Sequence, residues 1–261
     1  MKIGVFDSGL GGLILLKAIV KKLPRYDYIY LGDTGRVPYG NRSQGTIYEF
    51  TRQAVDFLFK RNCRLIIVAC NTASAVALRR IQREYLPKHY PDRRVLGVII
   101  PTAEVTTGLS PVGVLATEST VSSNAFAREL KKLNPKLAIF QEPAPLLVPL
   151  VEHNSTKLAA PILKSYLSPL LKRKVRGIVL GCTHYPLLKS QIRKMAKGVK
   201  IISQDEVIPT KLADYLKRHP ETEGKLTKHR GRELYVTDFT ENISQKARKW
   251  FGSTKLRPTK L

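Results

Sequence analysis

The chain has 261 residues, of which 43% are hydrophobic and 25% are charged, close to the average usage of globular proteins. This length allows one large α/β domain or two modest ones, and a core can form without disulfides. No apolar run approaches the roughly 18 residues that a membrane span needs, and no signal-peptide pattern opens the sequence. We therefore expect a soluble, cytoplasmic protein without a membrane partner.

The charge is unusual, because 45 lysine and arginine residues against 20 aspartate and glutamate residues give a net charge of +25. Such a field attracts polyanions and makes any nucleic-acid contact salt-dependent. The basic residues are dispersed along predicted helices, however, and no nucleic-acid-binding module is recognisable. A solvated basic surface is the simpler interpretation, and nucleic-acid binding is the alternative.

Short apolar runs alternate with helix-length amphipathic segments along the whole chain. Strands are predicted, in chain order, at residues 3–6, 28–31, 65–69, 95–99, 112–116, 137–140, 175–180, 199–202 and 234–236. Helices are predicted at residues 12–23, 46–61, 73–85, 119–133, 156–171, 187–196, 207–218 and 241–251. This rhythm predicts an α/β fold with mainly parallel sheets flanked by helices, whose ligands bind beyond the carboxyl ends of the strands.

Two cysteines are the strongest candidates for chemistry. Cysteine acts as the thiolate, and its pKa falls near a helix N-terminus or a cation. Cys70 and Cys182 each stand where a predicted strand leads into a helix, in the matching segments Ala-Cys-Asn-Thr and Gly-Cys-Thr-His. The match suggests two related halves whose thiols flank one cleft. A small buried hydrophobic residue is the alternative for an isolated cysteine, and it is our interpretation of Cys63. The spacing of the three cysteines predicts neither a disulfide nor a metal site.

Polar residues follow the same strands. Asp7 could cap the glycine-rich turn at 9–12, or bind an ammonium group. That turn lacks the GxGxxG and Walker patterns, so nucleotide binding is not expected. His184 could be a satisfied polar residue in a tight turn, or a general base beside Cys182. Donors suited to carboxylates are supplied by Asn71, Thr72, Thr117, Thr120 and Thr183.

Taken together, these motifs resemble the bacterial glutamate racemase family, in the family's order and over nearly the whole chain. The resemblance rests on segments 6–9, 32–34, 37–40, 69–74, 148–152 and 180–188. It implies two similar α/β domains with the active site in the cleft between them, and neither pyridoxal phosphate nor a metal as cofactor. It also implies racemisation of L-glutamate and D-glutamate, which supplies D-glutamate for peptidoglycan and so for cell-wall biogenesis and cell shape.

The resemblance also implies residue roles. Cys70 would remove the α-proton of D-glutamate and Cys182 that of L-glutamate, each returning a proton to the carbanion formed by the other. Asp7, with Glu152, would assist at the Cys70 side, and His184 at the Cys182 side. The substrate would be held by Asp7, Ser8, Tyr39, Gly40, Asn71, Thr72, Thr117, Thr120, Thr183 and His184.

We predict one domain from residues 1–97 and 206–261 and a second from residues 98–205. The turn around Pro101 and the linker at 110–111 are boundary signals, and the tail 257–261 is expected to fray. By resemblance the chain forms a homodimer. It departs from the family in its charge and at Ser203-Gln204, where Ser-Gly is frequent.

Two other functions are considered. A racemase acting on aspartate is the first, because one methylene changes discrimination by only about 1–3 kcal/mol, although Thr183-His184 favours glutamate. The second is association with nucleic acid or with gyrase, a side activity of some family members, for which retention on DNA would depend on salt.

Overall fold

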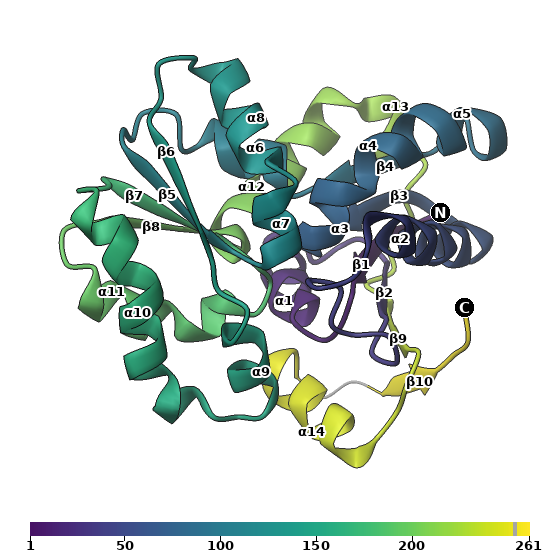
Figure 1. Cartoon of the computed structure of the whole chain (residues 1–261). Coiled ribbons are helices and arrows are strands. Elements are labelled where there is room, and N and C mark those ends of the chain that lie inside the picture. Colours follow the sequence, from purple (N-terminus) through teal and green to yellow (C-terminus); the bar gives the residue numbers. More distant parts are fainter. Residues whose placement is uncertain (253–254) are drawn as a thin grey trace.

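The protein builds two parallel sheets, each flanked by helices (Figure 1). The structure is a computed structural model that describes residues 1–252 and 255–261. The larger sheet has the strand order β10-β9-β2-β1-β3-β4, and the smaller sheet has the order β6-β5-β7-β8. Neighbouring strands run parallel throughout both sheets. The predicted α/β class with parallel sheets is confirmed.

The strands are buried, largely apolar runs, as expected for parallel sheets that helices cover on both faces. Those of the larger sheet are β1 (Lys2–Asp7), β2 (Tyr28–Gly32), β3 (Cys63–Val68), β4 (Arg94–Gly97), β9 (Arg232–Val236) and β10 (Leu256–Pro258). Those of the smaller sheet are β5 (Val112–Ala116), β6 (Ile139–Pro143), β7 (Gly177–Gly181) and β8 (Lys200–Ser203). Every predicted strand is present, with its ends shifted by at most three residues.

The helices fill the connections between strands. They are α1 (Gly12–Lys22), α2 (Gln44–Lys60), α3 (Asn71–Val76), α4 (Leu78–Arg80), a π-helical turn (Ile81–Tyr85), α5 (Leu86–His89), α6 (Ile99–Glu104), α7 (Glu118–Ser122), α8 (Ala125–Leu133), α9 (Leu147–Glu152), a 3₁₀ turn (Thr156–Leu158), α10 (Ala159–Lys172), a 3₁₀ turn (Tyr185–Leu188), α11 (Lys189–Met195), α12 (Gln204–Arg218), α13 (Pro220–Glu223) and α14 (Glu241–Trp250). Among the described residues, no helix combines the length and the apolar composition needed to cross a membrane.

Two predictions of local structure are wrong. The helix predicted over 119–133 is broken, because Asn124 adopts a left-handed conformation with φ 54° between α7 and α8. Asparagine tolerates this conformation better than most residues. The strand predicted to end at Ile99 stops at Gly97, and the turn expected around Pro101 is instead part of α6. Pro101 lies in the first turn of that helix, where its missing N–H costs no hydrogen bond.

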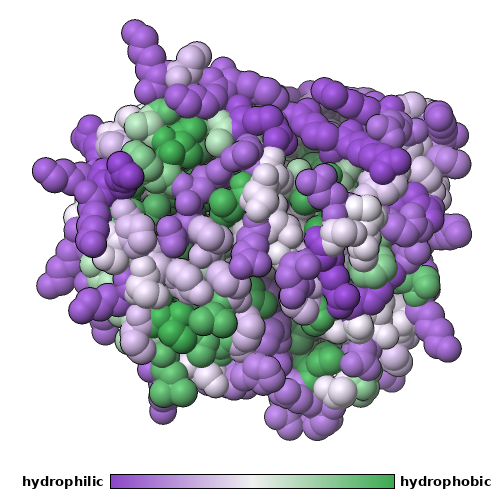
Figure 2. All heavy atoms as spheres, in the orientation of Figure 1, coloured by the Kyte–Doolittle hydropathy of each residue, from purple (hydrophilic) through white to green (hydrophobic). Residues whose placement is uncertain are grey.

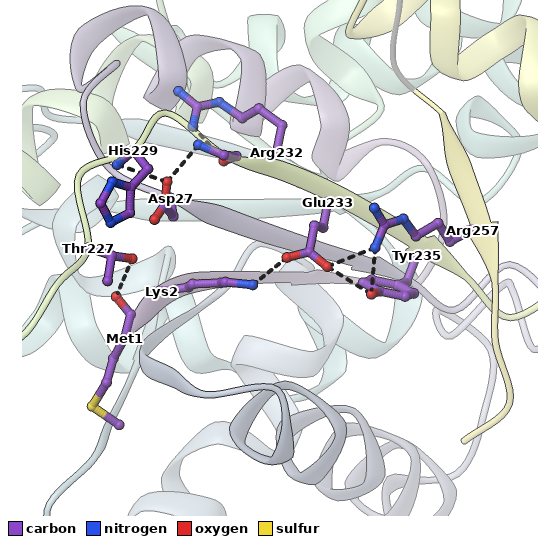
Figure 3. A network of polar contacts seen from close by, with 10 residues as sticks. Met1, Lys2, Asp27, Thr227, His229, Arg232, Glu233, Tyr235 and Arg257 are labelled. Atoms are coloured by element: carbon purple, nitrogen blue, oxygen red, sulfur yellow. Dashed lines mark hydrogen bonds and ion pairs between the residues drawn. The ribbon is translucent and has the colours of Figure 1, made fainter.

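The C-terminal tail is also more ordered than predicted. Arg257 and Pro258 belong to β10, which pairs with β9, and the N–H of Thr259 donates to the carbonyl of Val236 at 2.9 Å. Figure 3 shows the polar network along this edge. Arg257 and Lys2 both contact the carboxylate of Glu233, so the two ends of the chain are joined through β9. The expectation of a frayed tail is therefore wrong at these positions.

One continuous core joins the two sheets. Helix α1 packs against α12, and Leu16 of α1 and Leu212 of α12 belong to the same buried cluster as Leu180 of β7. The surface is mostly hydrophilic on the face shown in Figure 2, where hydrophobic residues form separate patches. The predicted domain boundaries at 97/98 and 205/206 stay a prediction. The carboxyl ends of β1, β3 and β7 all lead into residues that the sequence singles out, and that edge holds the candidate site.

Candidate active site

The two predicted cysteines line one cavity of about 140 Å³, one from each sheet. Cys70 caps the N-terminus of α3, where its Sγ accepts from the N–H of Ala73 at 3.5 Å and donates to Ser8 Oγ at 3.3 Å. Cys182 follows β7 directly, and its Sγ lies 3.8 Å from His184 Nδ1. Cys63, by contrast, lies in the buried strand β3 and does not line this cavity.

Most of the predicted binding residues also surround this cavity. Its lining includes the predicted residues Ser8, Tyr39, Gly40, Asn71, Thr72, Thr117, Thr183 and His184. Sequence reasoning did not single out several others as site residues, although they lie beside predicted ones in the chain. These are Val37, Pro38, Asn41, Glu118, Pro145, Val148 and Pro149.

Asp7 lies behind the cavity wall, between the glycine-rich turn and Thr183. Its Oδ2 accepts from the N–H groups of Gly9 and Gly12 at 3.2 and 3.0 Å, as a cap of the glycine-rich turn would. Its Oδ1 accepts from the hydroxyl of Thr183 at 3.2 Å. Burial raises the pKa of this carboxyl above its usual value, against the lowering effect of His184. Asp7 therefore caps the glycine-rich turn, and its charge is coupled to that of His184, while its binding of an ammonium group stays a prediction.

His184 and Glu152 form a close pair on the Cys182 side. His184 Nε2 donates to Glu152 Oε1 at 2.6 Å, while Nδ1 faces the sulfur of Cys182. The expected placement of Glu152 with Asp7 beside Cys70 is therefore corrected, because α9 brings the Glu152 carboxylate to the far edge of the His184 ring. Burial opposes the charge on His184, but Cys182 and Glu152 outweigh it and raise the pKa of His184 to about 10.

The two thiols have different electrostatic surroundings. Burial, reinforced by Asp7, raises the pKa of Cys70 to about 12, although Ser8 and the N–H of Ala73 act in the opposite direction. The N-terminus of α3 thus lowers the pKa of Cys70, as expected, through the N–H of Ala73, but burial outweighs this effect. Beside Cys182, in contrast, stands the His184 ring, whose Nδ1 lies 3.8 Å from the sulfur. Within the part of the chain that the structure describes, only Cys182 of the two thiols therefore has an imidazole beside it.

A cluster of threonine hydroxyls closes the cavity between the two sheets. Thr72 Oγ1 lies 2.9 Å from Thr117 Oγ1, which in turn lies 2.9 Å from Thr120 Oγ1. Thr120 supports the other two from behind and does not itself line the cavity. Across the opening, the hydroxyl of Ser119 donates to the carbonyl of Gly40 at 2.6 Å. These contacts hold the loop after β2 and the helix α3 against α7.

Two predicted binding side chains are already engaged by the protein. Tyr39 donates its hydroxyl to Asp33, so its ring forms part of the cavity wall. Asn71 exchanges two hydrogen bonds with Gln204, at 2.7 and 2.6 Å, and both side chains are buried. The sequence did not predict Gln204 as a residue of the site. The feature that could have indicated it is the sequence Ser203-Gln204, where the family frequently has Ser-Gly.

A larger cavity of about 210 Å³ lies elsewhere between the two sheets, and its lining contains no cysteine or histidine. Arg79 on α4 and Glu129 on α8 form an ion pair of 3.0 Å at its edge. We place the chemistry in the smaller cavity, because two thiols, an imidazole and several hydrogen-bond donors meet there.

Comparison with known proteins agrees with this geometry. Residues 3–208 match the family model described as Asp/Glu/Hydantoin racemase. The chain belongs to this racemase family. It is 40% identical to the glutamate racemase of Aquifex aeolicus over 250 residues, which cover 94% of this chain and 92% of that protein.

Solved members of the family have the same architecture. The glutamate racemase of Francisella tularensis, determined in complex with D-glutamate, superposes with a TM-score of 0.90 at 33% identity over 99% of this chain and 97% of that one. The isoform RacE1 glutamate racemase of Bacillus anthracis gives a TM-score of 0.90 at 32% identity over 100% and 97% of the two chains. The predicted resemblance to glutamate racemases is confirmed.

Proposed function

We propose that this racemase family member interconverts L-glutamate and D-glutamate, as a cofactor-independent isomerase. The observation that carries the proposal is the pair of thiols, Cys70 and Cys182, which reach one cavity from two different sheets. Inversion of a carbon centre in a fixed substrate needs a base on one face and an acid on the other, and two thiols on opposite sides supply both without any reorientation. The glutamate racemases that this chain resembles over nearly its whole length support glutamate as the substrate.

The chemistry runs in two directions through the same two groups. The Cys182 thiolate removes the α-proton of L-glutamate, while Cys70 delivers its proton to the opposite face and gives D-glutamate. In reverse, the Cys70 thiolate takes the α-proton of D-glutamate and Cys182 returns one. An amino-acid α-proton is a very weak acid, so the closed site must stabilise the carbanionic transition state with preorganised donors. His184 stabilises the Cys182 thiolate, with Glu152 behind it.

The donors around the cavity hold the substrate. The glutamate carboxylates accept hydrogen bonds from the hydroxyl, amide and backbone groups of Ser8, Tyr39, Gly40, Asn71, Thr72, Thr117, Thr183 and His184. Thr120 orients the hydroxyls of Thr72 and Thr117, and Asp7 interacts with the substrate ammonium through the wall of the site. These assignments extend the two-thiol proposal to the rest of the cavity.

The experiment that tests the proposal is a polarimetric or coupled assay of the purified protein with each enantiomer of glutamate, without added pyridoxal phosphate. We expect both enantiomers to reach a racemic mixture. L-aspartate and D-aspartate, assayed in parallel, measure the preference that one methylene provides. Inversion of aspartate but not of glutamate would replace the substrate and keep the mechanism, while inversion of neither would contradict the function.

The setting of the reaction follows from the substrate. D-glutamate made in the cytoplasm supplies peptidoglycan synthesis, and so supports cell-wall biogenesis and cell shape. The protein acts as a homodimer and needs no membrane partner. Size-exclusion chromatography with light scattering measures the oligomeric state directly.

Association with nucleic acid is a second candidate function, because exposed cations crowd one end of the smaller sheet. Between residues 131 and 202 the chain contains only two carboxylates, Glu142 and Glu152. At the amino ends of β6, β7 and β8 and in the helix ends beside them lie the exposed residues Lys131, Lys132, Lys136, Lys172, Arg173, Lys174, Arg176, Lys194, Lys197 and Lys200. Figure 1 shows this end of the smaller sheet pointing away from the larger one.

Charge reversal tests this second candidate. The triple change Lys172→Glu, Lys174→Glu and Lys197→Glu should reduce retention on DNA and flatten its dependence on salt. The matched control reverses three exposed lysines of α1 (Lys17, Lys21 and Lys22), which alters the net charge equally. Equal losses in both triple variants would assign the retention to net charge alone.

A further inference from the structure

The C-terminal helix α14 brings a buried lysine to the active-site pair. The Nζ of Lys246 donates to Glu152 Oε2 at 3.0 Å, and the Lys246 side chain is only 8% exposed. Lysine is rarely buried unless it is paired, because desolvation of the ammonium group is costly. Neither the family's motifs nor the proposed mechanism uses this residue, so its burial has to be explained by the contact with Glu152.

Lys246 is the last member of a row of four interacting groups. Cys182 faces His184 at 3.8 Å, His184 donates to one oxygen of Glu152 at 2.6 Å, and Lys246 donates to the other. The same helix brings the Trp250 ring against His184 in a T-shaped arrangement, with the ring centroids 6.1 Å apart. Helix α14 therefore fixes both the charge and the orientation of the pair that supports Cys182.

The charges of this row balance only when Lys246 is included. Protonated His184 and ionised Glu152 cancel each other, so a Cys182 thiolate beside them would leave one uncompensated negative charge in a buried site. With the ammonium of Lys246 the three groups carry a net charge of +1, and the thiolate brings the row to neutrality. Uncompensated buried charge is strongly unfavourable, which gives the lysine a physical role.

Among the residues that the structure describes, the other ionisable groups coupled to this row are acids, thiols or phenols, which supply no positive charge. Asp7 on β1 reaches Thr183 and can only add negative charge, as can the thiol of Cys70. Two buried tyrosines, Tyr30 on β2 and Tyr185 after β7, donate their hydroxyls to backbone carbonyls. Burial raises the pKa of both phenols far from neutrality, so they remain uncharged.

We propose that Lys246 is a positioning residue that balances the charge of Glu152, so that protonated His184 stabilises the Cys182 thiolate. The role of Lys246 in catalysis rests on the proposed racemase function, but the experiment that tests it does not require turnover. The readout is alkylation of each cysteine by iodoacetamide as a function of pH, in the whole substrate-free protein, with peptide mass spectrometry to assign the site. Alkylation follows the thiolate, so it reports the charge state of Cys182 without any turnover.

Replacing Lys246 by methionine keeps the length of the stem and removes the charge. Lys246→Met should move the pH midpoint of Cys182 alkylation upward by about one unit, a rate loss of about tenfold at neutral pH. The profiles of Cys63 and Cys70 should not move. Lys246→Arg should restore the wild-type profile, and kcat for both enantiomers should fall in Lys246→Met and recover in Lys246→Arg. The matched control is Lys249→Met, which removes an exposed lysine from the same helix.

A second variant and a double variant separate charge from structure. Lys246→Gln keeps a donor to Glu152 without the charge, so it should reproduce the shift, and it serves as the test if Lys246→Met does not fold. In a Glu152→Gln background, Lys246→Met should add no further upward shift, because the lysine acts through that carboxylate.

An unchanged Cys182 profile, equal shifts at all three cysteines, or the same shift in Lys249→Met would overturn the inference. An absence of glutamate turnover in the wild-type protein would instead contradict the proposed function. The alkylation profiles would still show whether Lys246 affects the thiolate of Cys182.

Discussion

Gly11 tests the geometry of the site most sharply among the residues that touch no substrate. It caps the N-terminus of α1 in an ordinary right-handed conformation, with φ −56° and ψ −34°, which alanine also adopts. A Cβ at this position would lie 2.6 Å from Thr183 Oγ1 and 2.8 Å from His184 Nδ1. The glycine is therefore required by the close approach of the two sheets and not by its backbone angles.

The size of the effect follows from these distances. Ordinary contact begins at about 3.4 Å, so Gly11→Ala must displace the His184 ring by about 0.6 Å. The displaced nitrogen is the one that faces Cys182, and the other ring nitrogen is held by Glu152 at 2.6 Å. A misplacement of about 1 Å can cost roughly a hundredfold in rate. We expect kcat to fall by about 10- to 100-fold, with an overpacking cost of about 1–3 kcal/mol in the free energy of unfolding.

The assay is the initial rate from each enantiomer, with urea unfolding followed by circular dichroism to establish the folded fraction. The matched control is Gly45→Ala, since a Cβ at Gly45 in the first turn of α2 meets nothing within 4 Å. This control should keep the wild-type kcat and gain up to about 1 kcal/mol of stability from helix propensity. Wild-type turnover in folded Gly11→Ala would refute the reasoning that ties activity to this contact.

Three further predictions concern the ionisable groups. Cys70→Ser and Cys182→Ser should each abolish racemisation, because serine does not form an alkoxide near neutral pH, whereas Cys63→Ser should retain most of the activity. Near wild-type turnover in Cys70→Ser or Cys182→Ser would contradict the two-thiol site. Asp7→Asn and His184→Asn should change kcat and KM differently for the two enantiomers. The ratio kcat/KM stays equal in both directions, because the equilibrium is a property of the substrates. Identical kinetic changes in both variants would contradict their separate roles. Burial raises the pKa of both Cys63 and Cys70 to about 12 from about 9. The stability that the two buried thiols contribute is therefore complete below pH 9 and is lost as the pH rises toward 12. Over that pH range, the decline in the urea midpoint should be shallower in Cys63→Ser than in the wild-type protein.

Local signals in the sequence were sufficient for the fold class and for most of the cavity lining. The apolar runs are long enough to identify every strand of the two sheets except β10, and Cys70 and Cys182 follow β3 and β7 because strand ends converge in parallel sheets. Two local predictions failed because the deciding feature was a single residue or a contact between distant segments. Asn124 breaks an otherwise continuous amphipathic segment, and β10 exists because Arg257 and the backbone of β9 provide partners distant in sequence.

The contacts behind the first layer of the site could not be predicted, because they join residues far apart in the chain. Glu152 and His184 meet through the packing of α9 against the turn after β7. Lys246 reaches them from α14, 94 residues beyond Glu152. Its spacing from Ile243, Ala247 and Trp250 places it on the buried face of that helix, unlike the exposed Lys249, but the spacing does not identify Glu152 as its partner. The balance between burial and the helix N-terminus at Cys70 likewise depends on how completely the folded chain excludes water.

The direct test of the two-thiol site is the fate of the α-proton in heavy water. If Cys182 removes the proton from one face and Cys70 delivers another from the opposite face, each inversion places a solvent deuteron on the product. Mass spectrometry of the separated enantiomers at low conversion should therefore find deuterium in the product and almost none in the remaining starting enantiomer. Substantial protium in the product, or deuterium entering the starting enantiomer at a comparable rate, would show a single shuttling base and contradict the account.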